Sequence, residues 1–268
     1  MNLWRLFVAE LRREAILLVR YPLETVSRLV WNLGFALLIF FGFSAAVGSQ
    51  ASSLPGFEEG NVGRLLGLLT TYIAINGLGN AAELIAEEVQ TGTLEQAALS
   101  PPPLVVVVLL RDLASYVEML LRFALVLAIA CLVTGVRLHL DVPAYIVLLT
   151  LMYLGMEGIG LMLGGAGLIA KRITTLAQFA VMLVFGLAIV PLAELPAWTR
   201  PLVAGFPFTN ALEQLRAVAV GGTSLGHLWA AGQLPGLLAG AATWLVAGLV
   251  VFAFAERKAR DLGTLNQY

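Results

Sequence analysis

The sequence is poor in the residues that build disulfide frameworks, metal sites and soluble surfaces. Its 268 residues include one cysteine and two histidines, and only 12% are charged, where a soluble domain carries about 25%. Cys131 has no partner for a disulfide within the chain, so it is interpreted as a small buried hydrophobe. His139 and His227 lack carboxylate or cysteine companions at ligand spacing, so no metal site is expected. Ser115 and Ser224 lack a recognisable base, so no catalytic nucleophile is expected.

Long apolar runs take up most of the chain, of which 59% is hydrophobic. A bilayer core about 30 Å thick needs roughly 20 apolar residues in a helix, and six runs reach that length. We therefore predict an all-α integral membrane protein with six transmembrane helices and both termini on one side. The expected spans are about 29–48, 63–82, 113–136, 143–170, 173–193 and 234–255.

The basic residues predict which side holds the termini. Eleven would lie on the side of the termini: Arg5, Arg12, Arg13, Arg20, Arg28, Arg111, Lys171, Arg172, Arg257, Lys258 and Arg260. Four would lie on the opposite side: Arg64, Arg137, Arg200 and Arg216. Because cytoplasmic loops carry the excess of Lys and Arg, we expect both termini in the cytoplasm of a protein of the cell (inner, cytoplasmic) membrane.

Residues 1–22 have the spacing of an amphipathic helix. Apolar residues recur every three or four positions, and arginines occupy most of the remaining face. With an Arg-rich polar face, such a helix lies along the cytoplasmic membrane surface until Pro22 ends it. A helix packed on a soluble core is the alternative, but no soluble core is left for it. The membrane domain is then 23–258, and 259–268 form a cytoplasmic tail.

The segment 194–233 is too apolar and aromatic for a solvated loop, yet prolines interrupt it. This composition predicts re-entrant or interfacial helices in the outer leaflet before the sixth span, where surrounding protein tolerates irregular backbone. The other outer loops are short and could not hold a domain. Candidate residues of this external segment are Pro207, Thr209, Glu213 and Arg216.

The stretch "EEVQTGTLEQAALSPPP", residues 87–103, interrupts two apolar runs on the cytoplasmic side. The helix of the second span can continue until Gly92, which offers a left-handed C-cap. Thr93 and Gln96 have the spacing of a capping box, and Pro101 ends the next helix after about two turns. We predict a short capped helix across the membrane base that needs a packing partner. On these grounds alone, a plain acidic loop remains an equal alternative.

This stretch resembles the cytoplasmic segment of type-2 ATP-binding cassette (ABC) exporter permeases, which reads as an acidic pair, two variable residues, Gly-Thr-Leu-Glu and then Ser-Pro. A weaker likeness lies in "FPFTNALEQLRAV", 206–218, which resembles the Pro-hydrophobic-Thr segment of the same family followed by Glu and Arg. The matching residues of the first segment are Glu87, Glu88, Gly92, Thr93, Leu94, Glu95, Ser100 and Pro101.

The resemblance implies a type-2 ABC transmembrane domain whose coupling helix, within 87–101, docks on a separate ATPase (nucleotide-binding) subunit. It also implies a second permease, identical or homologous, with the translocation path between the two. The chain has no G-x-x-x-x-G-K-[ST] loop, and neither of its lysines, Lys171 and Lys258, follows one. We therefore expect a non-catalytic membrane subunit without a cofactor of its own, whose partner ATPase binds ATP and Mg²⁺.

Three charged residues lie well inside the expected spans, away from their ends. Glu118 and Arg122 are four apart on one helix face and can pair, as a structural clamp between helices or as a substrate contact. A solitary charge facing lipid is disfavoured because its insertion costs about 2.5–3.5 kcal/mol. Glu157 interrupts a glycine-rich span in which Gly160 and Gly164 form a G-x-x-x-G pair. Glu157 either lines a cavity, with a proton-sensitive role, or hydrogen-bonds to a neighbouring helix.

The leading function is the permease subunit of an ATP-driven exporter of a drug, lipid or other amphiphile. A polysaccharide-exporting ABC permease is the alternative. A secondary transporter is a weaker one, because the two halves of the sequence show no convincing internal repeat. A membrane-embedded enzyme lacks a catalytic cluster. Membrane lipid is an expected partner and nucleic acid is not, because the basic residues flank membrane spans, where they anchor topology.

Overall fold

The computed structural model describes residues 3–47, 57–91, 103–170, 174–189, 196–199 and 203–261. Within these ranges the regular structure is helical, which confirms the all-α prediction. The helices are α1 (Leu3–Arg20), α2 (Pro22–Val47), α3 (Phe57–Thr91), α5 (Leu104–Thr134), α6 (Val142–Ala170), α7 (Thr174–Ile189), α9 (Pro207–Gly221), α10 (Leu225–Ala230) and α11 (Gln233–Asp261).

Among the described residues, five helical stretches are long and apolar enough to cross a membrane. They lie in α2, α3, α5, α6 and α11 and overlap five of the six expected spans. Of the run expected at 173–193, the structure describes residues 174–189, which form the apolar helix α7 of 16 residues. Length and composition thus support a multi-pass membrane protein with five long spans and one shorter apolar helix.

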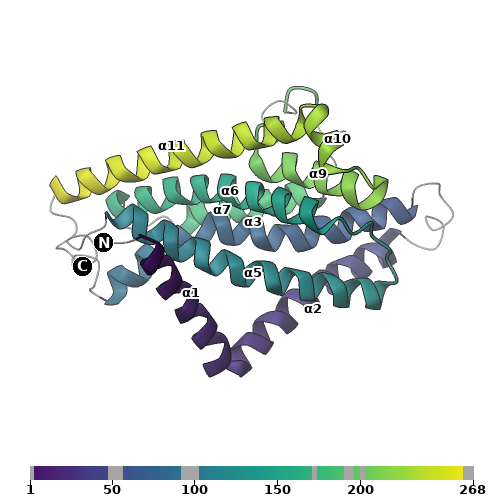
Figure 1. Ribbon diagram of the computed structural model, residues 1–268, viewed down its shortest axis with the longest axis horizontal. Helices are drawn as coiled ribbons and strands as arrows, with labels where there is room; N and C mark the ends of the chain where they lie inside the picture. Colours follow the sequence, from purple (N-terminus) through teal and green to yellow (C-terminus); the bar gives the residue numbers. More distant parts are fainter. Residues whose placement is uncertain are drawn as a thin grey trace.

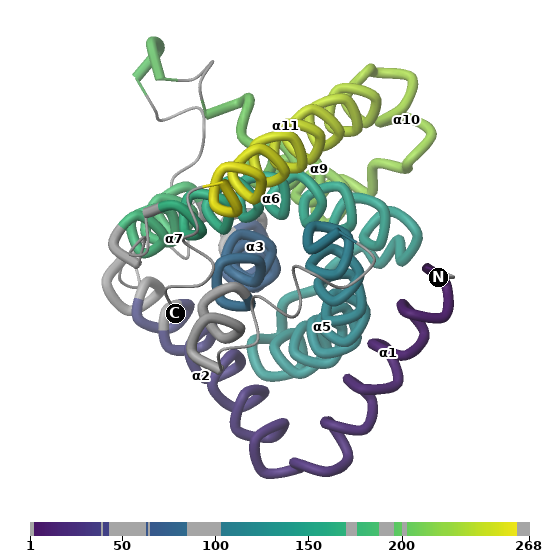
Figure 2. The backbone as a smooth tube through the Cα atoms, turned by 90° about the vertical axis from the view of Figure 1, so that its left-hand side faces the viewer, coloured from purple at the N-terminus to yellow at the C-terminus, as the bar shows by residue number. Residues whose placement is uncertain are grey.

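The long helices run side by side as an elongated bundle (Figure 1). Viewed along the bundle, α3 lies inside, with α6, α7, α5 and α2 around it (Figure 2). Helix α11 packs on the outer side of α6. The end of α3, the start of α5 and the end of α11 lie at one end of the bundle, and α9 and α10 lie at the other.

Helices α1 and α2 form a V whose tip projects from the bundle, while α1 packs on α5 and α2 packs on α3 and α5 (Figures 1 and 2). Pro22 was predicted to end the first helix, and in the structure it also begins the second. Helix α1 ends at Arg20, and Pro22 is the first residue of α2, a position where its missing N–H and fixed φ cost nothing. Consequently α2 starts seven residues before the expected span at 29. Every described residue of α1 is at least partly exposed.

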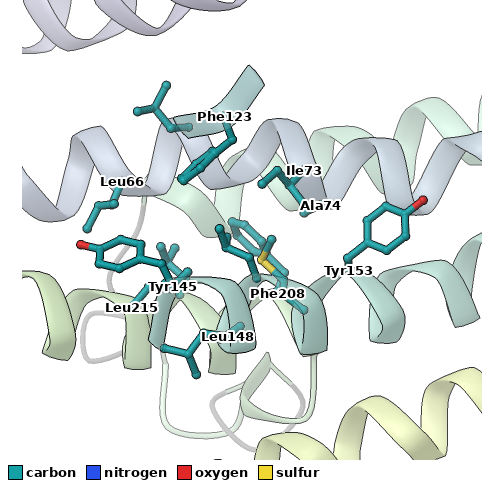
Figure 3. Packing of buried hydrophobic residues seen from close by; sticks show 14 of the residues in the cluster. Leu66, Ile73, Ala74, Phe123, Tyr145, Leu148, Tyr153, Phe208 and Leu215 are labelled. Carbon is teal, nitrogen blue, oxygen red and sulfur yellow. The ribbon is translucent and has the colours of Figure 1, made fainter. Parts of the chain in front are cut away.

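The core lies where α3, α5, α6 and α9 meet. Figure 3 shows Ile73 and Ala74 of α3 packed near Phe123 of α5 and Phe208 of α9. Ile73, Ala74 and Phe208 have no exposed surface, and Phe123 retains 6%. The burial of this one cluster joins the spans to α9, so the segment expected outside the membrane is an integral part of the fold.

Glycines allow α6 to approach its neighbours closely. A Cβ on Gly158 would lie 2.2 Å from the carbonyl oxygen of Trp244, and one on Gly248 would lie 2.1 Å from the carbonyl oxygen of Gly158. On another face, a Cβ on Gly160 would lie 2.6 Å from the carbonyl oxygen of Gly77 in α3. The backbones therefore touch at both contacts, as small residues permit in membrane helix packing.

Candidate functional site

The predicted ion pair in the third span is present. Arg122 is 8% exposed, and its Nε donates to Glu118 Oε1 at 3.1 Å, while Nη2 donates to the same oxygen. Its remaining terminal nitrogen, Nη1, donates to the hydroxyl of Tyr72 in α3 at 2.6 Å. The charge of Arg122 is thus compensated within α5, and the hydrogen bond from its Nη1 to Tyr72 links α5 to α3.

Beside this pair lies an apolar cavity of about 350 Å³ between α2, α3, α5 and α7. Its volume is at the lower end of the range of small-molecule sites, about 300–1,000 Å³. Aromatic rings form much of its wall, and Asn32, Asn76 and Arg122 supply the polar groups. The aromatic residues that line it are Trp31, Phe35, Tyr72, Phe123 and Phe185.

A smaller polar cavity of about 160 Å³ lies between α1, α2 and α5, and Arg122 lines both it and the apolar cavity. Its walls carry Glu14 and Glu24 from the two arms of the V, together with Glu118. An open cavity of about 570 Å³ shares Glu14, Leu17 and Arg28 with the small one. The small cavity thus shares lining residues with both of the others, and the series of three is polar at one end and apolar at the other.

Glu157 is almost completely buried, at 1% exposure. Within the described residues, neither of its oxygens accepts a hydrogen bond from an N–H or O–H donor, and neither does Asp112 Oδ2. The side chains of Asp112 and Glu157 lie within hydrogen-bonding reach of each other. A hydrogen bond between two carboxyl groups requires that one of them carries the proton. Glu157 on α6 thus has a carboxyl partner, Asp112 on α5, which the sequence pattern does not predict.

Polar side chains around the buried pair connect it to the open cavity. The Tyr153 hydroxyl donates to the Asp112 carbonyl at 3.0 Å, and Asn80 Nδ2 donates to Tyr153 Oη at 3.4 Å. Asp112 and Asn80 also line the 570 Å³ cavity. Glu157 itself does not line any of the three cavities, so it lies behind the cavity wall.

The segment 194–233, which was expected to be external, contains the helices α9 and α10. Pro207 opens α9 and packs against α6, where a Cβ on Gly155 would lie 2.6 Å from it. Thr209 is 5% exposed, and its hydroxyl has no hydrogen-bond partner among the described residues. Arg216 Nε donates to the Gly63 carbonyl at 3.3 Å, which ties α9 to α3.

Burial lowers the pKa of Arg216, and nearby Glu213 acts in the opposite direction. Glu213 itself is exposed. The four predicted residues of the external segment therefore do not form one cluster. Pro207 and Thr209 pack into the core, Arg216 links two helices, and Glu213 points to the surface.

Most of the predicted coupling segment lies outside the described residues. Helix α3 ends at Thr91, one residue before the predicted C-cap Gly92, and α5 starts at Leu104. The backbones of Glu87 and Glu88 belong to the last turns of α3. Gly92, Thr93, Leu94, Glu95, Ser100 and Pro101 fall between the two helices, in residues that are not described.

The serine, histidines and cysteine for which no catalytic or metal-binding role was expected lie at the following places in the fold. Ser224 caps α10 by accepting from the backbone N–H of His227 at 3.4 Å. The N–H of His139 donates to the Ala219 carbonyl at 2.9 Å, and Cys131 is a free, half-buried thiol. Within the described ranges no group of three His, Cys, Asp or Glu residues could hold a metal ion.

No curated protein matches this sequence. A family model described as "ABC-2 type transporter" matches residues 5–220, which is well over half of the chain. The match runs from α1 through α9 and includes the helices that line all three cavities. Members of this family are transmembrane subunits that work with ABC ATPase subunits. The chain belongs to the ABC-2 type transporter family and is a multi-pass transmembrane permease of that family.

Proposed function

We propose that this permease is the membrane subunit of an ATP-driven exporter of amphiphiles in the cell membrane. Two permeases, identical or homologous, form the translocation path, and partner subunits bind ATP and Mg²⁺ and hydrolyse the nucleotide. The observation that carries the proposal is the family match over 5–220. The series of cavities, polar at one end and apolar at the other, supports an amphiphile as cargo.

The bundle geometry supports coupling through 87–101. The two helices that flank this segment, α3 and α5, have their connected ends at the same end of the bundle as the end of α11 (Figure 1). The last turn of α11 is basic, with Lys258 and Arg260, as expected for a cytoplasmic end. Both termini are therefore cytoplasmic in this proposal, and an ATPase docks at that end.

Charge reversal at Glu95 tests the coupling. Purified permease with its ATPase is reconstituted in vesicles, and ATP-dependent movement of a fluorescent amphiphile is followed. Glu95→Lys should abolish ATP-dependent movement and reduce co-purification of the ATPase, because the docking helix loses its acidic character. Glu59→Lys, the same change in the first turn of α3 at the opposite end, is the matched control. Equal transport by both variants would show that 87–101 does not couple the subunits.

A further inference from the structure

The charged side chains of the small polar cavity leave one carboxylate without an ion-pair partner among the described residues. The four arginines that line this cavity or the adjoining open cavity each have such a partner. Arg13 and Arg111 pair with Glu10 at 3.4 and 3.9 Å, Arg28 pairs with Glu24, and Arg122 pairs with Glu118. The remaining carboxylate of the small cavity is Glu14.

Glu14 has no ion pair or hydrogen bond within the part of the chain that the structure describes. Its burial raises its pKa; Arg13 and Arg111 lower that pKa, and Glu118 and Glu10 raise it. The net direction is upward, so the nearby guanidinium groups do not compensate the lost hydration of the carboxylate. Because Glu24, Arg28 and Arg122 are already paired, a further positive charge in the small cavity would stabilise Glu14.

The neighbouring apolar cavity suits the body of an aromatic or apolar molecule. The Trp31 and Phe35 rings stack with centroids 6.2 Å apart, and Phe35 meets Phe185 edge-on at 5.7 Å. Trp31 is 72% exposed on α2, so the cavity opens toward the surface of the bundle that a bilayer would cover. Aromatic faces attract cations and repel anions, which gives the same charge preference as Glu14.

Arg122 separates the two cavities but is a poor site for an anion. Nε and Nη2 both donate to Glu118, and Nη1 donates to Tyr72. An anionic group would have to break one of these bonds inside the protein. It would also lie close to the carboxylates of Glu14 and Glu118, which line the same small cavity.

We propose that these two cavities form one binding site for a cationic amphiphile. Its aromatic or apolar body occupies the cavity between α2, α3, α5 and α7, and its ammonium or similar group lies beside Glu14. This inference rests on the proposed function, because it names the substrate class of the same permease. It adds a site within a single permease chain, and that site can be tested without the ATPase.

Two probes with the same ring system and opposite charge test the site. The full-length permease is placed in phosphatidylcholine nanodiscs, which carry no net lipid charge, and binding is followed by fluorescence polarisation with empty nanodiscs as background. We expect (aminomethyl)anthracene, a cation, to bind at least about tenfold more tightly than anthracenecarboxylate, an anion, which is the effect of roughly one good charged contact. Equal affinities, tighter binding of the anion, or no binding of either probe would overturn the proposal.

Substitutions then locate the two halves of the site. Glu14→Gln should weaken binding of the cation about tenfold and leave the anion unchanged or slightly improved, because only the charge is removed. Asp261→Asn removes an exposed negative charge at the end of α11, outside all three cavities, and should change neither affinity. Val126→Trp fills the apolar cavity and should weaken both probes equally. An unchanged cation preference in Glu14→Gln contradicts the assignment of Glu14.

Transport separates this inference from the proposed function. If the cation binds as expected but ATP drives no amphiphile across reconstituted vesicles, the site stands and the exporter function fails. If ATP drives an anionic or neutral amphiphile and the cationic probe does not bind, the function stands and the cationic site fails. Export of the cationic probe that is lost in Glu14→Gln supports both.

Discussion

Substitution of Gly158 tests whether backbone contact between α6 and α11 holds the bundle together. A Cβ at this position would lie 2.2 Å from the Trp244 carbonyl oxygen, 2.3 Å from its carbonyl carbon and 2.6 Å from the Leu245 nitrogen. Ordinary contact begins at about 3.4 Å, so the helices must separate locally by about 1.2 Å. All three obstructing atoms are backbone, and no side-chain rotation can relieve the clash.

Gly158→Ala should therefore destabilise the protein by about 1–3 kcal/mol, the usual cost of overpacking. Alanine alone would favour the helix by up to about 1 kcal/mol, so the steric cost must exceed that gain. The assay is reversible unfolding in mixed micelles with increasing sodium dodecyl sulfate, followed by tryptophan fluorescence. The matched control is Gly240→Ala on α11, where a Cβ would meet nothing within 4 Å. Equal stability of the two variants would refute the reasoning.

The reciprocal contact gives an internal check on the same argument. A Cβ on Gly248 would lie 2.1 Å from the Gly158 carbonyl oxygen, so Gly248→Ala should cost a similar amount. Once one Cβ has separated the helices, the second meets less resistance. The double variant should therefore cost clearly less than the sum of the single variants, as expected for residues in contact. Simple additivity would mean that the two glycines do not share one contact.

Three further outcomes follow from the charged and close contacts. Arg122→Met should cost about 3 kcal/mol in the same unfolding assay, because it leaves Glu118 unpaired; the double variant with Glu118→Gln should recover most of this, and no recovery would argue against a clamp. Binding of the cationic probe should weaken as pH falls through the raised pKa of Glu14, because the cation favours the ionised form and protonation removes it; the same pH profile in Glu14→Gln would contradict this. Gly63→Ala should cost less than about 1 kcal/mol, because its Cβ would meet only the movable Arg216 side chain at 3.3 Å; a cost like that of Gly158→Ala would show that this side chain cannot move.

The sequence was most informative about features that depend on local pattern. Apolar runs located five long spans because burial in lipid requires about 20 apolar residues in succession. The pairing of Glu118 with Arg122 followed from their spacing of one helical turn. The sequence predicted that Pro22 ends one helix but not that it begins the next, although proline also suits the first position of a helix.

The candidate site was harder to predict because it depends on tertiary contacts. Glu14 belongs to an amphipathic surface helix whose charges look alike in the sequence, and only the fold shows which arginines are already paired. Asp112 was missed because it lies one residue before the expected third span. Tyr72 has no local signal, since its hydroxyl matters only through Arg122 on another helix.

The positions of Tyr72 and Arg122 connect the proposed binding site with the proposed coupling segment. Tyr72 lies on α3, and Arg122 lies on α5. These are the two helices that the segment 92–103 joins. At 1.5 Å per residue, the helical path is about 29 Å from Tyr72 to Thr91 and about 27 Å from Leu104 to Arg122. A helix transmits displacement along its axis as a nearly rigid element, so a push between the two ends changes the relative position of α3 and α5. The hydrogen bond between Tyr72 and Arg122 spans these helices at the boundary of the apolar and polar cavities. On the proposed function, the same pair of helices thus carries both the ATPase contact and the wall of the cargo site.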